Sequence, residues 1–126
     1  VVDDNRVNQT LTRKMLEVLG LRVVIASDGE QAVALFPRRR WDLVLMDCQM
    51  PRMDGFEVTR RIRRLEREEA RTPVIAMTAN VLAEDRKRSA EAGMDDHLSK
   101  PFDLEDLNEL LHRWLPVEAR DEQRAV

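Results

Sequence analysis

Cysteine is almost absent from the sequence, with Cys48 as its single representative among 126 residues. A lone thiol cannot form an internal disulfide framework or build a zinc site by itself, so disulfide-rich and zinc-stabilised small domains are excluded. No apolar run approaches the roughly 18 residues that a membrane-spanning helix needs, and no secretory signal is visible. We therefore expect a cytoplasmic domain with no membrane contact of its own, which leaves open a membrane-bound parent protein.

The chain also lacks an excess of basic charge, since 21 lysines and arginines stand against 24 aspartates and glutamates, for a net charge of −3. This balance does not favour binding to nucleic acid. Arginines cluster at 38–40 and between 60 and 67, which indicates a solvated loop and helix face, or alternatively contacts with phosphates or an acidic partner. The length predicts one globular domain. The missing initiator methionine and the short first strand at Val1 suggest a piece of a longer protein.

Phosphate-binding loops and hydrolase motifs are missing as well. Neither G-x-x-x-x-G-K nor G-x-G-x-x-G occurs, there is no H-E-x-x-H, and the histidines, His97 and His112, do not assemble a Ser-His-Asp set. Nucleotide binding by this chain is therefore not expected.

Strand-like and helical segments alternate five times along the sequence. The predicted strands are apolar or β-branched runs at residues 1–2, 22–26, 42–47, 74–78 and 96–99. The predicted helices follow them, from Asn5 to Gly20, from Ser27 to Phe36, from Phe56 to about Glu68, from Asn80 to Ala92 and from Asp103 to Leu115. Such alternation favours a parallel sheet covered by helices on both faces, with right-handed crossovers.

Local signals mark the ends and faces of these helices. The first helix places an apolar series on one face, namely Val7, Leu11, Met15, Val18 and Leu19. Ser27 and Glu30 form an S-x-x-E capping box for the second helix. In the third helix, Ile62 and Leu65 are predicted to point inward and the arginines outward. Asn80 and Asp103 are N-cap candidates for the last two helices, and Gly93 and Pro116 are predicted to end them. Residues 117–126 are predicted to form a linker or a frayed end.

Residues suited to phosphate chemistry stand at the ends of four predicted strands: Asp3-Asp4, Asp47, Thr78 and Lys100. Because the carboxyl ends of parallel strands meet in one crevice, these side chains should converge. Three crowded carboxylates repel one another unless a hard cation such as Mg²⁺ lies among them. A carboxylate beside such a cation can form an aspartyl phosphate, and Asp47 is the candidate nucleophile.

Each of these residues also has a plainer interpretation. Asp47 can simply begin a turn, and Asp3 and Asp4 can serve the helix cap around Asn5. Lys100 precedes Pro101, where a cis peptide bond is one of the alternatives. Its ammonium could pair with Asp47 before reaction and with a phosphate oxygen afterwards.

Four segments carry a family resemblance: Val-Val-Asp-Asp-Asn, Met-Asp-Cys-Gln-Met-Pro-Arg-Met-Asp-Gly, Ile-Ala-Met-Thr-Ala-Asn and Leu-Ser-Lys-Pro-Phe. From Val1 to about Leu115 the chain resembles the receiver domain of two-component response regulators. The resemblance implies a flavodoxin-like, three-layer α/β fold with five parallel strands in the order 2-1-3-4-5. It also implies that Asp47 accepts phosphate from a histidine.

The same resemblance assigns the other site residues. Mg²⁺ or Mn²⁺ would be held by Asp3, Asp4, Asp47 and the main-chain carbonyl of Gln49. The phosphate would contact Thr78, Ala79 and Lys100, with Thr78 as the switch hydroxyl.

Three further positions bear on the switch and on dephosphorylation. His97 stands where the family usually has Tyr or Phe; it could bring a pH-sensitive charge to the switch face or have no role. Gln49 and Asn80 correspond to positions that modulate dephosphorylation, and neither is a strong general base. We therefore expect a phosphorylated lifetime longer than that of fast-cycling members.

Details such as Asn8 and Cys-Gln-Met-Pro resemble receivers fused to hybrid histidine kinases. The implied partners are a histidine kinase domain and a histidine phosphotransfer protein docking around Asn8, Leu11 and Met15. A homodimer through the fourth helix, last strand and final helix is also implied as an option. The receiver would span 1–116 with a tail at 117–126, and would show self-phosphorylation and autodephosphorylation rather than conventional enzymatic turnover.

Other interpretations stay open at this point. One is a stand-alone or effector-linked transcriptional response regulator. Another is a pseudo-receiver that only binds partners, although this chain keeps all the acids. A haloacid-dehalogenase-like phosphohydrolase is the remote alternative, because that class needs an acid two residues after the nucleophile, where this chain has Gln49.

Overall fold

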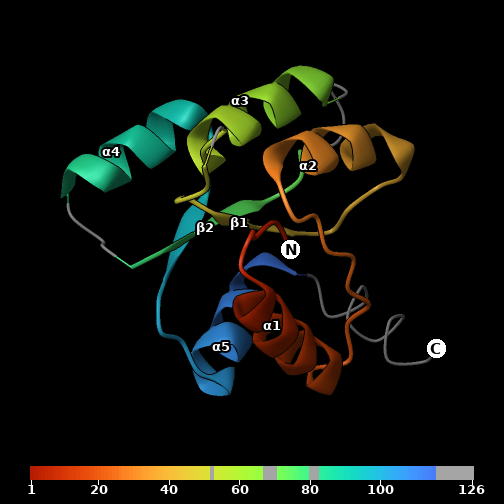
Figure 1. The fold of residues 1–126 in the computed structure, drawn as a ribbon. Coiled ribbons are helices and arrows are strands. Elements are labelled where there is room, and N and C mark those ends of the chain that lie inside the picture. Colours follow the sequence, from red (N-terminus) through yellow and green to blue (C-terminus); the bar gives the residue numbers. More distant parts are fainter. Residues whose placement is uncertain (52, 67–70, 80–82, 116–126) are drawn as a thin grey trace.

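The computed structural model describes residues 1–51, 53–66, 71–79 and 83–115. Figure 1 shows a sheet between two layers of helices, with α2, α3 and α4 on one face and α1 and α5 on the other. The elements in chain order are α1 (Arg6–Val18), α2 (Gly29–Leu35), the short 3₁₀ helix η1 (Phe36–Arg38), β1 (Val44–Asp47), α3 (Gly55–Leu65), β2 (Val74–Thr78), α4 (Ala83–Ala92), β3 (Asp96–Ser99) and α5 (Leu104–Trp114). The predicted parallel sheet covered on both faces is confirmed.

The sheet of named strands is parallel, in the order β1-β2-β3. Val2 lies beside it and forms isolated parallel bridges with Ala26 on one side and Met46 on the other. The first two predicted strands thus contribute single bridges rather than ladders, and a five-stranded order is not confirmed. Backbone hydrogen bonds from Val2 to Leu45 and from Asp3 to Ala26 accompany these bridges.

Side chains alternate between two cores because successive strand residues point to opposite faces. Val44, Met46, Val74 and Ala76 belong to the cluster under α2, α3 and α4. Leu45, Ile75, Met77 and Leu98 belong to the cluster shared with α1 and α5. All the residues of β1 and β2 are buried, as expected for strands covered on both faces.

Helix α1 begins at the predicted cap, where the Asn5 side chain accepts a hydrogen bond from the Asn8 amide at 3.0 Å. Its predicted apolar series is divided: Val7, Leu11 and Val18 are 67%, 52% and 71% exposed, whereas Met15 and Leu19 pack in the core. Thr12 and Leu16 are the buried residues of the helix itself. The exposed part of this apolar series therefore marks a stripe on the surface of the molecule.

Helix α2 shows that the predicted Ser27–Glu30 capping box was wrong. Asp28 caps this helix, and its Oδ1 accepts a hydrogen bond from the Gln31 amide at 2.8 Å. The Gln31 side chain reaches back to the Ser27 amide at 2.9 Å. The N-cap is thus shifted by one residue from Ser27 to Asp28, because a carboxylate next to the predicted hydroxyl is at least as good an N-cap.

Helix α3 corrects two further expectations. Ile62 is buried as predicted, but Leu65 is 42% exposed. The Arg63 side chain points inward and is only 13% exposed. It donates hydrogen bonds to the carbonyls of Gly93 and Thr72, and buried carbonyls need such donors.

The last helices agree with the sequence where they are described. Gly93 follows α4 with φ of 99°, the left-handed conformation that glycine adopts at helix ends. Asp103 and Asp106 form a capping box for α5, and Leu107, Leu110 and Leu111 are fully buried. The predicted cap Asn80, the stop Pro116 and the tail at 117–126 lie outside the described residues. Among the described helices, none has the length and apolar character to cross a membrane.

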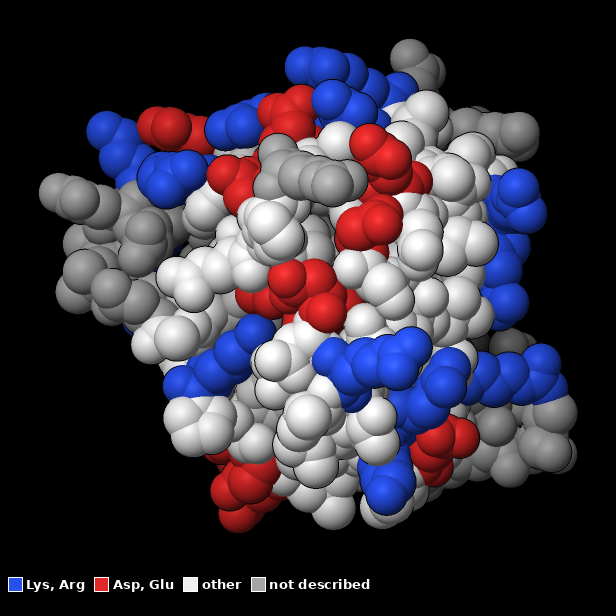
Figure 2. All heavy atoms as spheres, in the orientation of Figure 1, with Lys and Arg blue, Asp and Glu red and all other residues white. Residues whose placement is uncertain are grey.

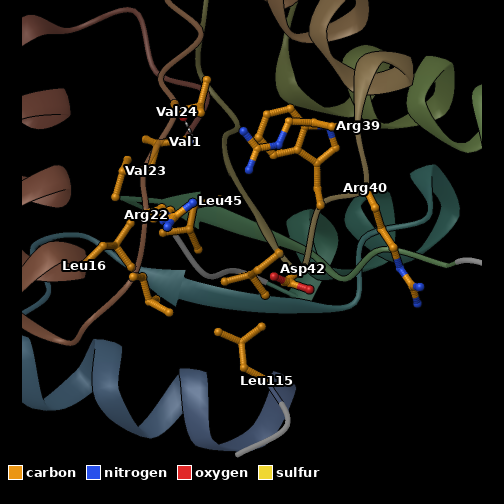
Figure 3. Close-up of a pocket in the computed structure, with 13 residues that line it drawn as sticks. Val1, Leu16, Arg22, Val23, Val24, Arg39, Arg40, Asp42, Leu45 and Leu115 are labelled. Carbon is orange, nitrogen blue, oxygen red and sulfur yellow. Dashed lines mark hydrogen bonds between the residues drawn. The ribbon is translucent and has the colours of Figure 1, made fainter. Parts of the chain in front are cut away.

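A cavity of ≈ 390 Å³ is lined by apolar side chains that include Val1, Leu43 and Leu115. Val1 and Leu115 are labelled in the close-up of this cavity (Figure 3). Arg22, Arg39 and Asp42 stand among the residues that line it. Leu43 and Asp42 precede β1, so this cavity lies at the end of the sheet opposite to Asp47. It is separate from the polar residues at the carboxyl ends of the strands.

Candidate functional site

The polar residues at the carboxyl ends of the parallel strands lie at one edge of the sheet. Asp47 is the last residue of β1 and Thr78 the last residue of β2, while Lys100 directly follows β3. Asp3 follows Val2, whose two bridges hold it level with β1. Lys100 Nζ lies 3.3 Å from Asp47 Oδ1 and 3.7 Å from Asp3 Oδ2. The predicted convergence of strand ends is therefore present in the structure.

The carboxylates of Asp3, Asp4 and Asp47 form an acidic cluster whose ligand oxygens lie within 4.8 Å of one another. In the space-filling view, acidic side chains gather in the middle of the molecular face, with basic side chains below them (Figure 2). Asp3 is completely buried and Asp47 nearly so, whereas Asp4 is exposed. Two buried carboxylates and an exposed one form a site that is closed toward the protein and open toward solvent.

Asp3 shows that this donor set fits a hard cation. Its Oδ1 accepts a hydrogen bond from the Asn5 amide at 2.9 Å. Its Oδ2 is buried and makes no hydrogen bond with any described residue, and the nearest cation is Lys100 at 3.7 Å. A buried carboxylate oxygen with no hydrogen bond is costly unless a cation compensates it. Oxygen-only donors of this kind suit Mg²⁺.

The electrostatic environment of Asp47 is set by opposing effects. Burial raises the pKa of the Asp47 carboxyl, and the nearby Asp3 carboxylate acts in the same direction. The Gln49 amide, which donates to Asp47 Oδ1 at 3.0 Å, and the Lys100 ammonium lower that pKa. Because burial dominates, the ionised form of Asp47 is poorly compensated in the protein alone. A bound cation would favour the ionised, nucleophilic form.

Gly55 is a site residue that the sequence interpretation missed. A Cβ at this position would lie 2.4 Å from the Asp47 carbonyl oxygen and 3.0 Å from the Cys48 Cα. The start of α3 therefore packs directly on the backbone of the acceptor residue. Asp54 holds this arrangement, because its Oδ1 caps α3 by accepting a hydrogen bond from the Glu57 amide at 3.0 Å. The Asp-Gly pair after a strand was the available signal.

Thr78 is buried, and its carbonyl accepts a hydrogen bond from the Lys100 amide at 2.8 Å. This bond ties the end of β2 to the residue that follows β3. Ala79 is exposed next to it. The Lys100–Pro101 peptide bond is cis, which is one of the two alternatives the sequence left open.

His97 pairs with Ala76 in the register of β2 and β3, which places it on the same face of the sheet as Thr78. Its Nε2 is buried and makes no hydrogen bond with the described residues. Burial lowers the pKa of His97, and the Asp96 carboxylate opposes that shift. Gln49 has an exposed side chain near Asp47, and Asn80 lies outside the described residues.

The family of the chain follows from comparison with known proteins. Residues 1–112 match the model of the response regulator receiver domain. The chain therefore belongs to the family of response regulator receiver domains, the modules of two-component phosphorelay signalling.

Particular relatives narrow the context. The chain is 42% identical over 127 aligned residues to probable histidine kinase 2 of Oryza sativa subsp. indica, a match covering 89% of this chain and 12% of that protein. It is 49% identical to the receiver domain of sensor histidine kinase PA1611 from Pseudomonas aeruginosa PAO1, with a TM-score of 0.81 and coverage of 90% and 92% of the two chains. That domain was crystallised with a magnesium ion in its active site cleft.

A third relative was solved with a partner. The receiver domain of Ssk1 from Saccharomyces cerevisiae, in complex with the histidine phosphotransfer protein Ypd1, matches with a TM-score of 0.82 and 26% identity over 90% of this chain and 84% of the other. The similarity to the rice kinase covers only a small part of that protein, so it concerns the receiver module alone.

Proposed function

We propose that this chain accepts a phosphoryl group from a phosphohistidine onto Asp47 and relays it to a histidine phosphotransfer protein, as the receiver module of a hybrid histidine kinase. The observation that carries this proposal is the position of Asp47. It faces the Lys100 ammonium at 3.3 Å and shares an acidic cluster with Asp3 and Asp4. A carboxylate nucleophile, a cation for the transferred group and a set of metal ligands are thus in one place.

The transfer follows from these groups. An oxygen of the Asp47 carboxylate attacks phosphorus, and the P–N bond to the donor imidazole breaks. The imidazole keeps the electron pair of that bond and takes up a proton from solvent. Lys100 exchanges its contact with the Asp47 carboxylate for a phosphoryl oxygen. Thr78 and the Ala79 amide stand at the end of β2 to contact the remaining phosphoryl oxygens, and we assign the switch to Thr78 and His97.

Asp3, Asp4, Asp47 and the main-chain carbonyl of Gln49 would hold Mg²⁺ or Mn²⁺. A divalent cation there would neutralise charge on the carboxylates and on the incoming phosphoryl group. This assignment is supported by the buried Asp3 Oδ2, which makes no hydrogen bond with the described residues, and by the magnesium ion in the similar receiver domain. Gln49 and Asn80 would modulate dephosphorylation, and an amide at each position is consistent with slow hydrolysis.

The partner would dock on α1, next to the acceptor. Val7 and Leu11 expose apolar side chains one turn apart, near the end of α1 that begins beside Asp4. Exposed apolar side chains on one helix face are typical of a surface that another helix covers. The Ypd1 complex of a similar receiver supports a phosphotransfer domain as that partner.

We further propose that residues 1–116 form the receiver unit, in which the segments at 1–2 and 22–26 supply the outer strands of a five-stranded sheet in the order 2-1-3-4-5. The paired bridges of Val2 with Ala26 and Met46 support that order. The face of α4, β3 and α5 is the surface we assign to a homodimer, should one form.

Intact-mass analysis tests the acceptor role directly. The chain is incubated with acetyl phosphate and Mg²⁺, beside the variant Asp47→Asn and a sample with a chelator. The proposal predicts a gain of one phosphoryl group in the native chain only, and none in either control. A gain in Asp47→Asn as well, or no gain in the native chain, would show that Asp47 is not the acceptor.

A further inference from the structure

Arg88 bridges α4 and the beginning of α3, on a side of the site that the transfer does not use. Its guanidinium lies over the Phe56 ring, with 4.4 Å between Cζ and the ring centroid. Its Nη2 is 3.9 Å from Asp54 Oδ2, while the other oxygen of Asp54 caps α3. A cation–π contact and a partly exposed ion pair are both weak interactions, so this bridge can open and close readily.

A cavity of ≈ 120 Å³ lies between this bridge and the phosphoryl site. Its walls include Gln49 from the loop after β1, Thr78 from the end of β2 and Arg88 from α4. A space of this size holds a few water molecules. The main-chain amide of Gln49 donates a hydrogen bond to Asp47 Oδ1 at 3.0 Å, so the wall of this cavity adjoins the acceptor carboxylate.

The Arg88 side chain lines the cavity and is also 57% exposed, so it is in contact with both the cavity and bulk solvent. We propose that Arg88 is a positioning residue that lengthens the lifetime of phosphorylated Asp47 by closing the cavity to solvent. The inference rests on the proposed acceptor role of Asp47. Arg88 touches none of the reacting atoms and acts through the loop and the water beside them.

The step that Arg88 restrains is hydrolysis of the acyl phosphate. A water oxygen attacks phosphorus, the bond between phosphorus and the Asp47 oxygen breaks, and Asp47 leaves as a carboxylate. The proton lost by the water passes to solvent, and inorganic phosphate is released. Without the guanidinium in its wall, the cavity would be wider and more water would reach its Asp47 side, so this attack would become more frequent.

The test compares half-lives of the phosphorylated chain. Native chain, Arg88→Ala, Arg88→Lys and the neighbouring control Lys87→Ala are phosphorylated with acetyl phosphate and Mg²⁺, freed of the donor and followed by intact mass. We expect Arg88→Ala to lose phosphate roughly three to ten times faster than the native chain, Arg88→Lys to fall between them, and Lys87→Ala to match the native chain. Asp54→Asn, which keeps the helix cap but loses the charge, should shorten the half-life by less than Arg88→Ala does.

Mg²⁺ affinity and thermal unfolding of the unphosphorylated variants provide the structural control. Arg88→Ala should bind Mg²⁺ and unfold as the native chain does. An unchanged or longer half-life, or a loss of Mg²⁺ affinity that parallels the faster decay, would overturn the role of Arg88 while Asp47 stays the acceptor. If the native chain gains no phosphate at all, the acceptor proposal fails first and this inference falls with it.

Discussion

Arg63 of α3 and Asp95, which precedes β3, form a buried ion pair with 2.7 Å between Nη2 and Oδ2. The pair lies at the end of the sheet opposite to the acidic cluster. Arg63 also donates to Glu66 at 2.8 Å, and Asp95 accepts a hydrogen bond from the Val74 amide at 2.9 Å. The guanidinium thus joins the end of α3, the start of β2 and the turn after α4, elements that carry the site at their other ends.

Replacing Arg63 with methionine should lower the free energy of unfolding by up to about 3–5 kcal/mol, because Glu66 would lose its ion-pair partner and Asp95 would keep only the exposed Arg71. Urea denaturation of both proteins measures this difference. The matched control is Arg60→Met, since Arg60 lies on the same helix in a surface pair with Glu57 and its side chain is 44% exposed. That variant should change the free energy of unfolding by less than about 1 kcal/mol. Equal effects of the two substitutions would contradict the role assigned to Arg63.

Gly55→Ala should slow phosphorylation of Asp47 and lower the free energy of unfolding by about 1–3 kcal/mol, because the new Cβ would push against the Asp47 backbone. Gly29→Ala is the matched control: Gly29 is likewise the first residue of a helix capped by aspartate. A Cβ at Gly29 would meet the Val58 Cγ2 and Met53 side-chain atoms rather than backbone. The Gly29→Ala variant should therefore leave the rate of Asp47 phosphorylation unchanged. Normal phosphorylation of Gly55→Ala would show that this backbone contact is not needed.

The sequence predicts the fold well where one physical signal dominates. The continuous apolar run that ends in Asp47 and the caps at Asn5 and Asp103 have local causes, so pattern and structure agree. Prediction from the sequence fails where contacts between distant segments determine which side chains are buried. Val7 and Leu11 follow the helical period but are exposed, and no described element of this chain covers them. Arg63 is buried because carbonyls distant in sequence need its donors.

The pKa of His97 is lowered by burial, so the histidine binds a proton less readily in the folded chain than in the unfolded chain. Its contribution to stability is therefore present above the unfolded pKa of about 6.5 and is lost as the pH falls through that value toward the folded pKa. Relative to the variant His97→Phe, the native chain should become less stable between about pH 7 and pH 5. Thermal unfolding of both proteins across this range measures the difference. A difference independent of pH would contradict the buried, neutral state of His97.

Leu11→Ala should slow phosphoryl transfer between this chain and a histidine phosphotransfer domain by roughly tenfold, as expected for a central apolar contact. Its phosphorylation by acetyl phosphate should not change, because Leu11 lies outside the acidic cluster. Val18→Ala is the control at the far end of the same exposed stripe, where a partner centred on the site does not reach. Transfer rates from a radiolabelled phosphotransfer domain distinguish these cases. Equal slowing by both substitutions would place the partner elsewhere.

The candidate site is more predictable than its surroundings. Asp3, Asp47, Thr78 and Lys100 could be placed together from sequence because each follows an apolar run, and parallel strands carry such ends to one edge. Gly55 and Arg88 could not be found in that way. Their importance lies in contacts with the Asp47 carbonyl and the Phe56 ring, which depend on how α3 and α4 pack over the sheet.

The most direct test of the account is chemical localisation of the phosphoryl group. After phosphorylation by a phosphohistidine donor in the presence of Mg²⁺, reduction with borohydride converts an aspartyl phosphate into homoserine, which peptide mass mapping locates. The account predicts homoserine at position 47 and at no other aspartate. Homoserine at position 3 or 4, or a phosphorylated chain whose position 47 is still aspartate after reduction, would contradict it.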